Sequence, residues 1–219
     1  MRSRVAASTE PSPDHQFPTP ALAFDIQHFF EESFRESAEV KLKTIEACSG
    51  PILAAVEAMA ATYRNGGKVL FCGNGGSAAD SQHLATELMI RLNHDLQRPA
   101  LAAISLCTDL SNLTAAGNDI GFQNVFARNV QGLGRAGDLL VAISTSGRSP
   151  NVVLAVQMAR SLGMTSIGLL GGTGGTLKDL CDVSIIIPSN NTQRIQEGHI
   201  TVGHVLCESV EQLLYGNHA

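Results

Sequence analysis

From Val69 onward, short and continuously apolar segments alternate with longer segments of helical periodicity. The apolar runs, each bounded by turn residues, predict five strands at Val69–Cys72, Leu101–Leu106, Leu139–Ile143, Ser166–Leu170 and Val183–Ile187. The intervening segments predict helices near Ala78–Asn93, Asp109–Ala116, Phe122–Leu133, Asn151–Leu162 and Thr176–Leu180, with a last one from about Thr192 to Leu214. Strands that are apolar throughout are typically buried on both faces. The pattern therefore favours an α/β fold with a five-stranded parallel sheet flanked by helices.

The segment before the first strand has helical periodicity, because Ile26, Phe30 and Phe34 recur every four residues. We expect N-terminal helices from Ala21 to about Arg64, with a break at Ser49-Gly50-Pro51.

Residues 1–20 contain four prolines and two arginines but no apolar stretch, so they do not resemble a signal peptide. We expect a disordered leader over 1–20 and a single domain over 21–219. With 44% hydrophobic residues, the domain can bury a full core.

Composition argues against several classes of partner. The net charge of −5 provides no basic surplus for a nucleic acid, and no run approaches 18 apolar residues, so no membrane span is expected. The cysteines are odd in number, scattered and without C-x-x-C spacing, which favours buried reduced thiols over disulfides or a cysteine zinc site. This is the composition of an acidic protein of the cytoplasm.

A glycine-rich turn, Gly73-Asn74-Gly75-Gly76-Ser77, follows the first predicted strand and opens a helix. Glycines let a ligand approach the backbone, and free N–H groups at a helix start favour an anion or polar oxygens. A purely structural turn is an equal alternative, since the motif does not match G-x-G-x-x-G. Ser77 and Asp80 also have the spacing of a capping box.

His83 and Glu87 lie four residues apart on the predicted helix behind this turn, so both project from one face. An imidazole and a carboxylate placed in this way can share a metal ion, as in zinc sites with histidine and carboxylate ligands. The alternative is a solvated ion pair on a surface helix. The neighbouring glycine-rich turn, which is suited to binding a ligand, favours the metal site.

A hydroxyl-rich loop, Ser144-Thr145-Ser146-Gly147-Arg148-Ser149-Pro150-Asn151, lies between the third predicted strand and a helix. Hydroxyls and backbone N–H groups at a helix start suit a phosphate monoester, and parallel sheets bind ligands at this edge. A loop that only caps the next helix needs one hydroxyl, not four.

The last helix carries polar residues within an apolar sequence. Gln196 and His204 are eight residues apart, a rise of about 12 Å, so either both lean toward one metal or each serves a site completed by another subunit. We therefore expect the site near a subunit interface. His199 is expected to support the site or the core rather than to act directly.

Together these segments resemble the sugar isomerase (SIS) domain family and, within it, the phosphoheptose isomerases. The similarity runs from about Phe24 to Leu214 and is carried by C-G-N-G-G-S-A-A-D-S-Q-H-L-A-T-E-L, A-A-G-N-D-I-G-F, G-D-L-L-V-A-I-S-T-S-G-R-S-P-N and R-I-Q-E-G-H-I-T-V-G-H. The resemblance implies a flavodoxin-like sheet and a homotetrameric enzyme of the bacterial cytoplasm, with one Zn²⁺ per subunit.

The resemblance also implies site residues. Zinc ligands would be His83, Glu87, Gln196 and His204, and the phosphate loop would comprise Ser144, Thr145, Ser146 and Ser149. Further substrate contacts would come from Asn74, Gly75, Gly76, Ser77, Asn118, Asp119 and Gln196. Two positions depart from the family pattern. Family members often have asparagine at the position of Arg148, and some have an acidic residue at the position of Gln193.

The implied reaction converts sedoheptulose 7-phosphate to D-glycero-D-manno-heptose 7-phosphate through an enediol, the first step of ADP- or GDP-heptose precursor biosynthesis. This chemistry needs a base and an acid, for which Glu87 and His204 are the candidates. The alternative is a non-catalytic tetrameric scaffold that binds the replication initiator DnaA. The DnaA-binding member of the family lacks the counterparts of Glu87 and His204, both of which are present here. A metal-independent etherase of the same fold is a further alternative.

Overall fold

The computed structural model describes residues 24–216. The leader predicted for residues 1–20 lies outside the described residues. Five parallel strands form one sheet in the order β2-β1-β3-β4-β5. This order is the flavodoxin-like variant of the doubly wound fold. The strands are β1 Val69–Gly73, β2 Ala103–Ser105, β3 Leu139–Ser144, β4 Thr165–Gly171 and β5 Val183–Ile187. All five predicted strands are present, and β2 is shorter than predicted.

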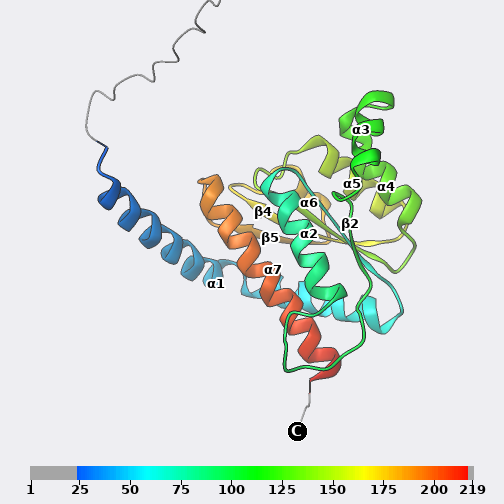
Figure 1. Cartoon of the computed structure of the whole chain (residues 1–219), viewed down its shortest axis with the longest axis horizontal. Coiled ribbons are helices and arrows are strands. Elements are labelled where there is room, and N and C mark those ends of the chain that lie inside the picture. The colour runs from blue at the N-terminus through cyan, green and yellow to red at the C-terminus, as the bar shows by residue number, and fades with distance from the viewer. Residues whose placement is uncertain (1–23, 217–219) are drawn as a thin grey trace, which may run out of the picture.

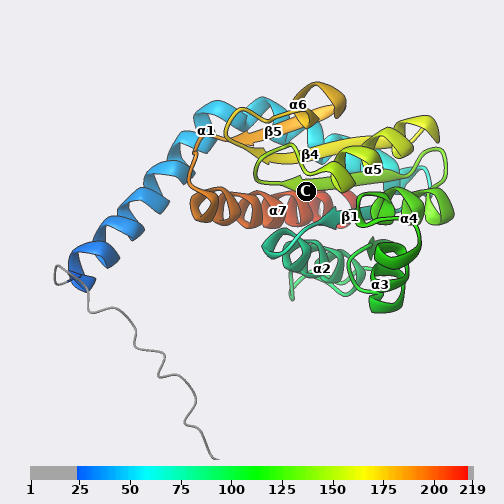
Figure 2. The same ribbon diagram turned by 90° about the horizontal axis from the view of Figure 1, so that it is seen from above.

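Helices cover both faces of the sheet (Figures 1 and 2). One face carries α1, α2 and α7, and the other carries α4, α5 and α6. The helices are α1 Ile26–Arg64, α2 Gly76–Met89, α3 Leu110–Asp119, α4 Val125–Leu133, α5 Pro150–Ser161, α6 Leu177–Leu180 and α7 Thr192–Tyr215, with a 3₁₀ turn at Phe122–Asn124. The predicted helices from the glycine-rich turn to the C-terminus are confirmed within a few residues.

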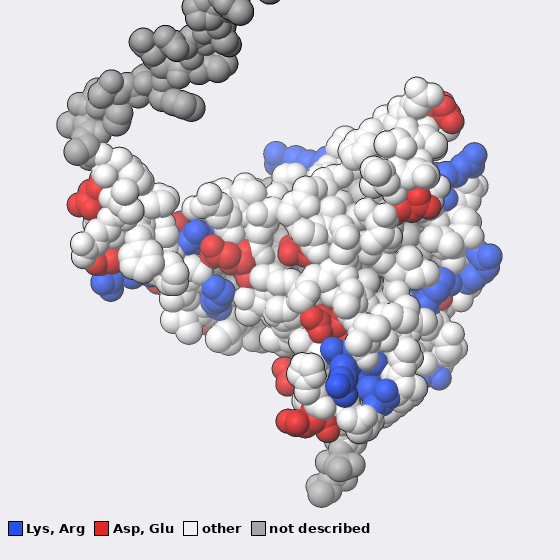
Figure 3. All heavy atoms as spheres, in the orientation of Figure 1, with Lys and Arg blue, Asp and Glu red and all other residues white. Residues whose placement is uncertain are grey.

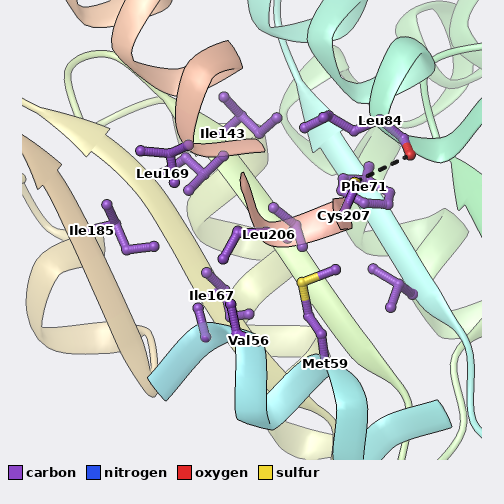
Figure 4. Close-up of a cluster of buried hydrophobic side chains, with 14 of the residues drawn as sticks. Val56, Met59, Phe71, Leu84, Ile143, Ile167, Leu169, Ile185, Leu206 and Cys207 are labelled. Carbon is purple, nitrogen blue, oxygen red and sulfur yellow. Dashed lines mark hydrogen bonds between the residues drawn. The ribbon is translucent and has the colours of Figure 1, made fainter. Parts of the chain in front are cut away.

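Alternation along each strand divides the core into two layers. Phe71, Leu169 and Ile185 face α1, α2 and α7 (Figure 4), whereas Leu70 and Leu140 face α4 and α5. All five side chains are at most 1% exposed. Each such burial stabilises the fold by about 1.5–3 kcal/mol, and these strands are therefore mostly apolar on both faces.

The expected break at residues 49–51 is wrong, because α1 continues through Pro51 as one helix of 39 residues. A proline inside a helix costs about 3 kcal/mol, since it removes one backbone hydrogen bond and crowds the preceding turn. Packing offsets this cost: Cys48 before the proline and Val56 and Met59 after it are all buried in the same core cluster.

The first half of α1 projects from the body of the protein (Figures 1 and 2) and exposes large apolar side chains. Ile26, Phe30, Phe34 and Leu42 are each more than half exposed. Contrary to expectation, α1 has the length and apolar composition of a membrane span, alone among the described helices. A third of its most apolar window is buried in the fold, however, and core helices pass the same test. Figure 3 shows basic and acidic groups interspersed on the face drawn.

Candidate active site

The glycine-rich turn joins β1 to α2 at the carboxyl edge of the sheet. Gly75 has φ +56° and forms the N-cap of α2 without a side-chain hydrogen bond, so the predicted capping box of Ser77 and Asp80 is wrong. Ser77 instead lies inside α2 and is buried, because the helix begins at Gly76, one residue before Ser77. The open left-handed turn leaves space beside Gly75, where a side chain would meet no other atom.

Asn74 in this turn is held by a residue that the sequence analysis missed. The side-chain amides of Asn74 and Asn151 exchange two hydrogen bonds, of 2.9 and 2.8 Å. Asn151 lies in the first turn of α5 and is buried. The pair therefore ties the glycine-rich turn to the hydroxyl-rich loop. The motif S-P-N contained Asn151, but only the packing of two strand ends gives it this partner.

The hydroxyl-rich loop runs from the end of β3 to the start of α5, as predicted. The Ser144 and Ser149 hydroxyls lie 3.0 Å apart, and Ser149 is the N-cap of α5 without capping it through its side chain. Gly147, at φ +62°, packs against the backbone of Gly174 so closely that a Cβ atom would collide. The free N–H groups at the start of α5 and the hydroxyls of this loop together form a site suited to an anion.

A hollow of about 250 Å³ adjoins this loop. Its walls combine three residues of the loop with the end of β4, the turn after it, and the start of α7 with the residue Asn190 before that helix. They are Thr145, Ser146, Arg148, Gly171, Gly172, Thr173, Asn190, Thr192 and Ile195. The sequence analysis missed Thr173, Asn190 and Thr192. The G-G-T-G-G turn directly after β4 was an available signal, because it occupies the same strand-end position as the two loops that were identified.

Three candidate metal ligands converge between α2 and α7. The ligand atoms of His83, Glu87 and His204 all lie within 4.8 Å of one another. The Nε2 atoms of the two histidines are 2.7 Å apart, and Glu87 Oε1 is 3.3 Å from His83 Nε2. His83 is exposed, whereas Glu87 and His204 are half-buried. Two imidazole nitrogens and a carboxylate oxygen form a donor set that zinc prefers, so these residues fit the implied ion.

Asp80 is a neighbour of this cluster that the sequence analysis treated only as a capping residue. Burial raises the pKa of its carboxyl group, and the nearby His83 and His204 lower it. Its Oδ2 is buried without a hydrogen-bond partner. One turn of α2 therefore presents a second carboxylate near the two histidines.

The other predicted residues lie in different places. The Gln196 side chain rests against Gly76, at the start of α2. Asn118 and Asp119 are exposed at the end of α3 and hydrogen-bond each other at 2.7 Å. Asp119 lines a separate hollow with Arg128. The structure thus brings His83, Glu87 and His204 together and places Asn118 and Asp119 away from the hollow beside the hydroxyl-rich loop.

His199 is completely buried, and its Nε2 atom is 2.9 Å from the carbonyl oxygen of Leu170. Burial lowers the pKa of the imidazole to about 4, while the hydrogen bond to Leu170 acts in the opposite direction. His199 is therefore neutral and faces β4, which agrees with the supporting role expected for it.

The fold and this site define a class of protein. It is a doubly wound α/β protein with a loop suited to binding an anion and a cluster of candidate metal ligands near one edge of its sheet. The SIS domain family model matches residues 33–171. A phosphoheptose isomerase from Pelodictyon phaeoclathratiforme is 52% identical over 179 residues, 81% of this chain and 85% of that protein. One from Roseiflexus sp. is 50% identical over 84% of this chain and 92% of that protein.

Solved structures agree with these relatives. The phosphoheptose isomerase from Neisseria gonorrhoeae superposes with a TM-score of 0.80 at 43% identity, covering 85% of this chain and 98% of that one. The enzyme from Francisella tularensis gives 0.81 at 39% identity, covering 84% and 97%. The chain belongs to the SIS domain family and, within it, to the phosphoheptose isomerases.

Proposed function

We propose that this protein isomerises sedoheptulose 7-phosphate to D-glycero-D-manno-heptose 7-phosphate through an enediol intermediate, the first step toward ADP- or GDP-heptose. The observation that carries the proposal is the convergence of His83, Glu87 and His204 in a chain half identical to phosphoheptose isomerases. A metal-type cluster and an anion-type loop suit an enzyme better than a DnaA-binding scaffold or a metal-independent etherase.

The cluster would hold one zinc ion, with Gln196 as the fourth ligand beside His83, Glu87 and His204. When bound, zinc supplies a Lewis acid that stabilises negative charge on substrate oxygens. The support is the chemistry of the donors, since two imidazoles and a carboxylate are typical zinc ligands. The Gln196 side chain lies against Gly76, at the start of the helix that carries His83 and Glu87.

The phosphate group would bind at the start of α5 through the hydroxyls and backbone N–H groups of Ser144, Thr145, Ser146 and Ser149. Arg148 lines the same hollow and adds a cation. Asn74, Gly75, Gly76 and Ser77 would position the sugar from the glycine-rich turn, with Asn118 and Asp119 from α3. The last two lie apart from the hollow, so their contact would require α3 to move or a second subunit to supply them.

Glu87 would act as the base. It takes a proton from the carbon next to the carbonyl and returns it to the former carbonyl carbon. Its Oε1 faces His83, which leaves Oε2 for the proton. His204 would protonate the carbonyl oxygen and later accept the proton from the neighbouring hydroxyl. Because a ring nitrogen bound to a metal carries no proton, this role requires His204 to exchange as a ligand during turnover. These transfers balance, because each proton that is removed is given back to the adjacent atom of the same type.

The protein would work as a homotetramer in the bacterial cytoplasm. The support is the projecting half of α1, whose Ile26, Phe30, Phe34 and Leu42 expose an apolar surface that a second subunit can cover. The metal cluster lies beside α7, which packs on α1, so such contacts would approach the site.

The test is turnover of sedoheptulose 7-phosphate by purified protein before and after treatment with a chelator. We expect turnover that the chelator abolishes and added Zn²⁺ restores. Glu87→Gln should lose about 10²–10⁴-fold in kcat, the usual contribution of a general base. Its unfolding free energy should change by less than about 0.5 kcal/mol, since glutamine keeps the shape of this half-buried side chain and an i, i+4 contact contributes little.

A Glu87→Gln protein with normal kcat would refute the role of Glu87. Absence of turnover from a folded, zinc-loaded wild-type protein would refute the isomerase. Metal-independent binding of DnaA would then favour the scaffold.

A further inference from the structure

A buried ion pair lies directly behind the metal-type cluster. Arg98, in the segment between α2 and β2, and Glu211, on α7, have side chains that are 0% and 1% exposed. Arg98 donates to Glu211 Oε1 through Nε at 2.7 Å and through Nη2 at 2.6 Å. Both charges are therefore removed from water and compensate each other.

The remaining polar atoms of this pair bind backbone groups. The Glu211 carboxylate accepts hydrogen bonds from the N–H groups of Leu92, at 3.0 Å, and Asn93, at 3.1 Å. Arg98 Nη2 also donates to the backbone oxygen of Glu87 at 2.8 Å. The pair thus joins α7 and the segment after α2 to the very residue whose side chain belongs to the cluster.

Two residues on the same face of α7, His204 and Glu211, both act on α2. Glu211 follows His204 by seven residues, or two helical turns, and so lies on the same side of the helix. Next to His204 the two helices are in close contact, since a Cβ atom at Gly203 would lie 2.6 Å from Leu84 Cδ1. His204 meets the side chain of His83, and Glu211 holds the backbone of Glu87 through Arg98.

From this arrangement we propose that Arg98 and Glu211 are positioning residues that fix the register of α2 against α7, so that Glu87 reaches the two histidines. The inference rests on the proposed function and adds two residues to it. Burying an ion pair contributes little net stability, and apolar replacements are often tolerated. The effect of the Arg98–Glu211 pair is therefore expected in the geometry of the cluster. Residues that hold metal ligands in place typically change metal affinity or activity by about 10–100-fold.

The first variant is Arg98→Lys. It keeps a positive charge for Glu211, but a single ammonium group cannot reproduce the fork that reaches both Glu211 and the Glu87 carbonyl. The second is the double variant Arg98→Met with Glu211→Gln, which removes both charges and retains an acceptor for the backbone N–H groups. If Arg98→Lys does not fold, the double variant decides.

The control is Lys68→Met. It breaks a different partly buried pair, in which Lys68 Nζ lies 2.5 Å from Asp138 Oδ2 at the start of β1 and β3, the opposite edge of the sheet. Its unfolding midpoint should fall while the cluster stays intact.

Each protein is titrated with Co²⁺, whose visible absorption reports the ligand geometry, and assayed for kcat and KM. We expect both test variants to bind Co²⁺ about 10–100-fold more weakly and to lose a similar factor in kcat, with KM changed less than about twofold. The control should keep the wild-type spectrum and kcat. Wild-type Co²⁺ affinity, spectrum and kcat in a folded test variant would overturn the inference. Lack of turnover by the wild type would refute only the proposed function, because Co²⁺ binding tests the positioning independently.

Discussion

Replacing His199 tests how a buried neutral imidazole limits stability in acid. The side chain is 0% exposed, its Nε2 hydrogen-bonds the Leu170 carbonyl, and its Nδ1 has no partner. Protonation of Nδ1 would place an uncompensated charge in the core, and burial accordingly lowers the pKa from 6.5 to about 4.

The sign follows from proton binding. Above pH 6.5 the imidazole is neutral in both states, and its contribution to the free energy of unfolding is complete. As the pH falls toward 4, the unfolded state binds a proton that the folded state does not, so stability is lost at about 1.4 kcal/mol per unit. The total loss is about 3 kcal/mol, after which both states are protonated.

The assay is urea unfolding of metal-free protein between about pH 7 and pH 4.5, for the wild type and His199→Gln. Glutamine retains a donor for the Leu170 carbonyl but cannot be protonated, so its stability should decline less steeply over this range. His28→Gln, at an exposed histidine of α1, is the control and should follow the wild type. Parallel pH profiles for the wild type and His199→Gln would refute the reasoning.

Three further changes test other parts of the structure. Pro51→Ala should raise the unfolding free energy by about 1–3 kcal/mol in urea titrations, because it restores a helical hydrogen bond; a lower midpoint would contradict this. Ser149→Ala should raise KM about tenfold with little change in kcat, and steady-state kinetics showing the reverse would argue against a phosphate contact. Replacing Phe30 and Phe34 together by Ser should shift the protein to smaller species in analytical ultracentrifugation, whereas an unchanged oligomer would show that this surface is not an interface.

The sheet was predictable because its signal is local. The segment Val183–Ile187 has its predicted bounds, β1 and β3 are one residue longer at one end, and β4 is one residue longer at each end. The continuation of α1 through Pro51 was not predictable from local preference, since burial of residues on both sides of the proline decides the outcome. The proline costs the helix about 3 kcal/mol, and the burial of several side chains on either side of it stabilises the helix by more than that.

The site was predictable to the extent that one helix carries it. His83 and Glu87 share a face of α2 because of their spacing alone. That His204 joins them depends on the close packing of Gly203 on Leu84, which brings α7 onto α2. Arg98 gave no signal, because it lies in an irregular segment and its partner is 113 residues away.

The contact between α1 and α7 has a consequence for how the chain reaches this fold during synthesis. The first and last helices lie side by side on one face of the sheet and bury each other's apolar residues, including Val56 and Met59 with Val202 and Leu206. That layer of the core cannot close until α7 has left the ribosome. Until then the surfaces of α1, α2 and the sheet that α7 buries stay exposed, and a nascent chain in this state is a substrate for chaperones.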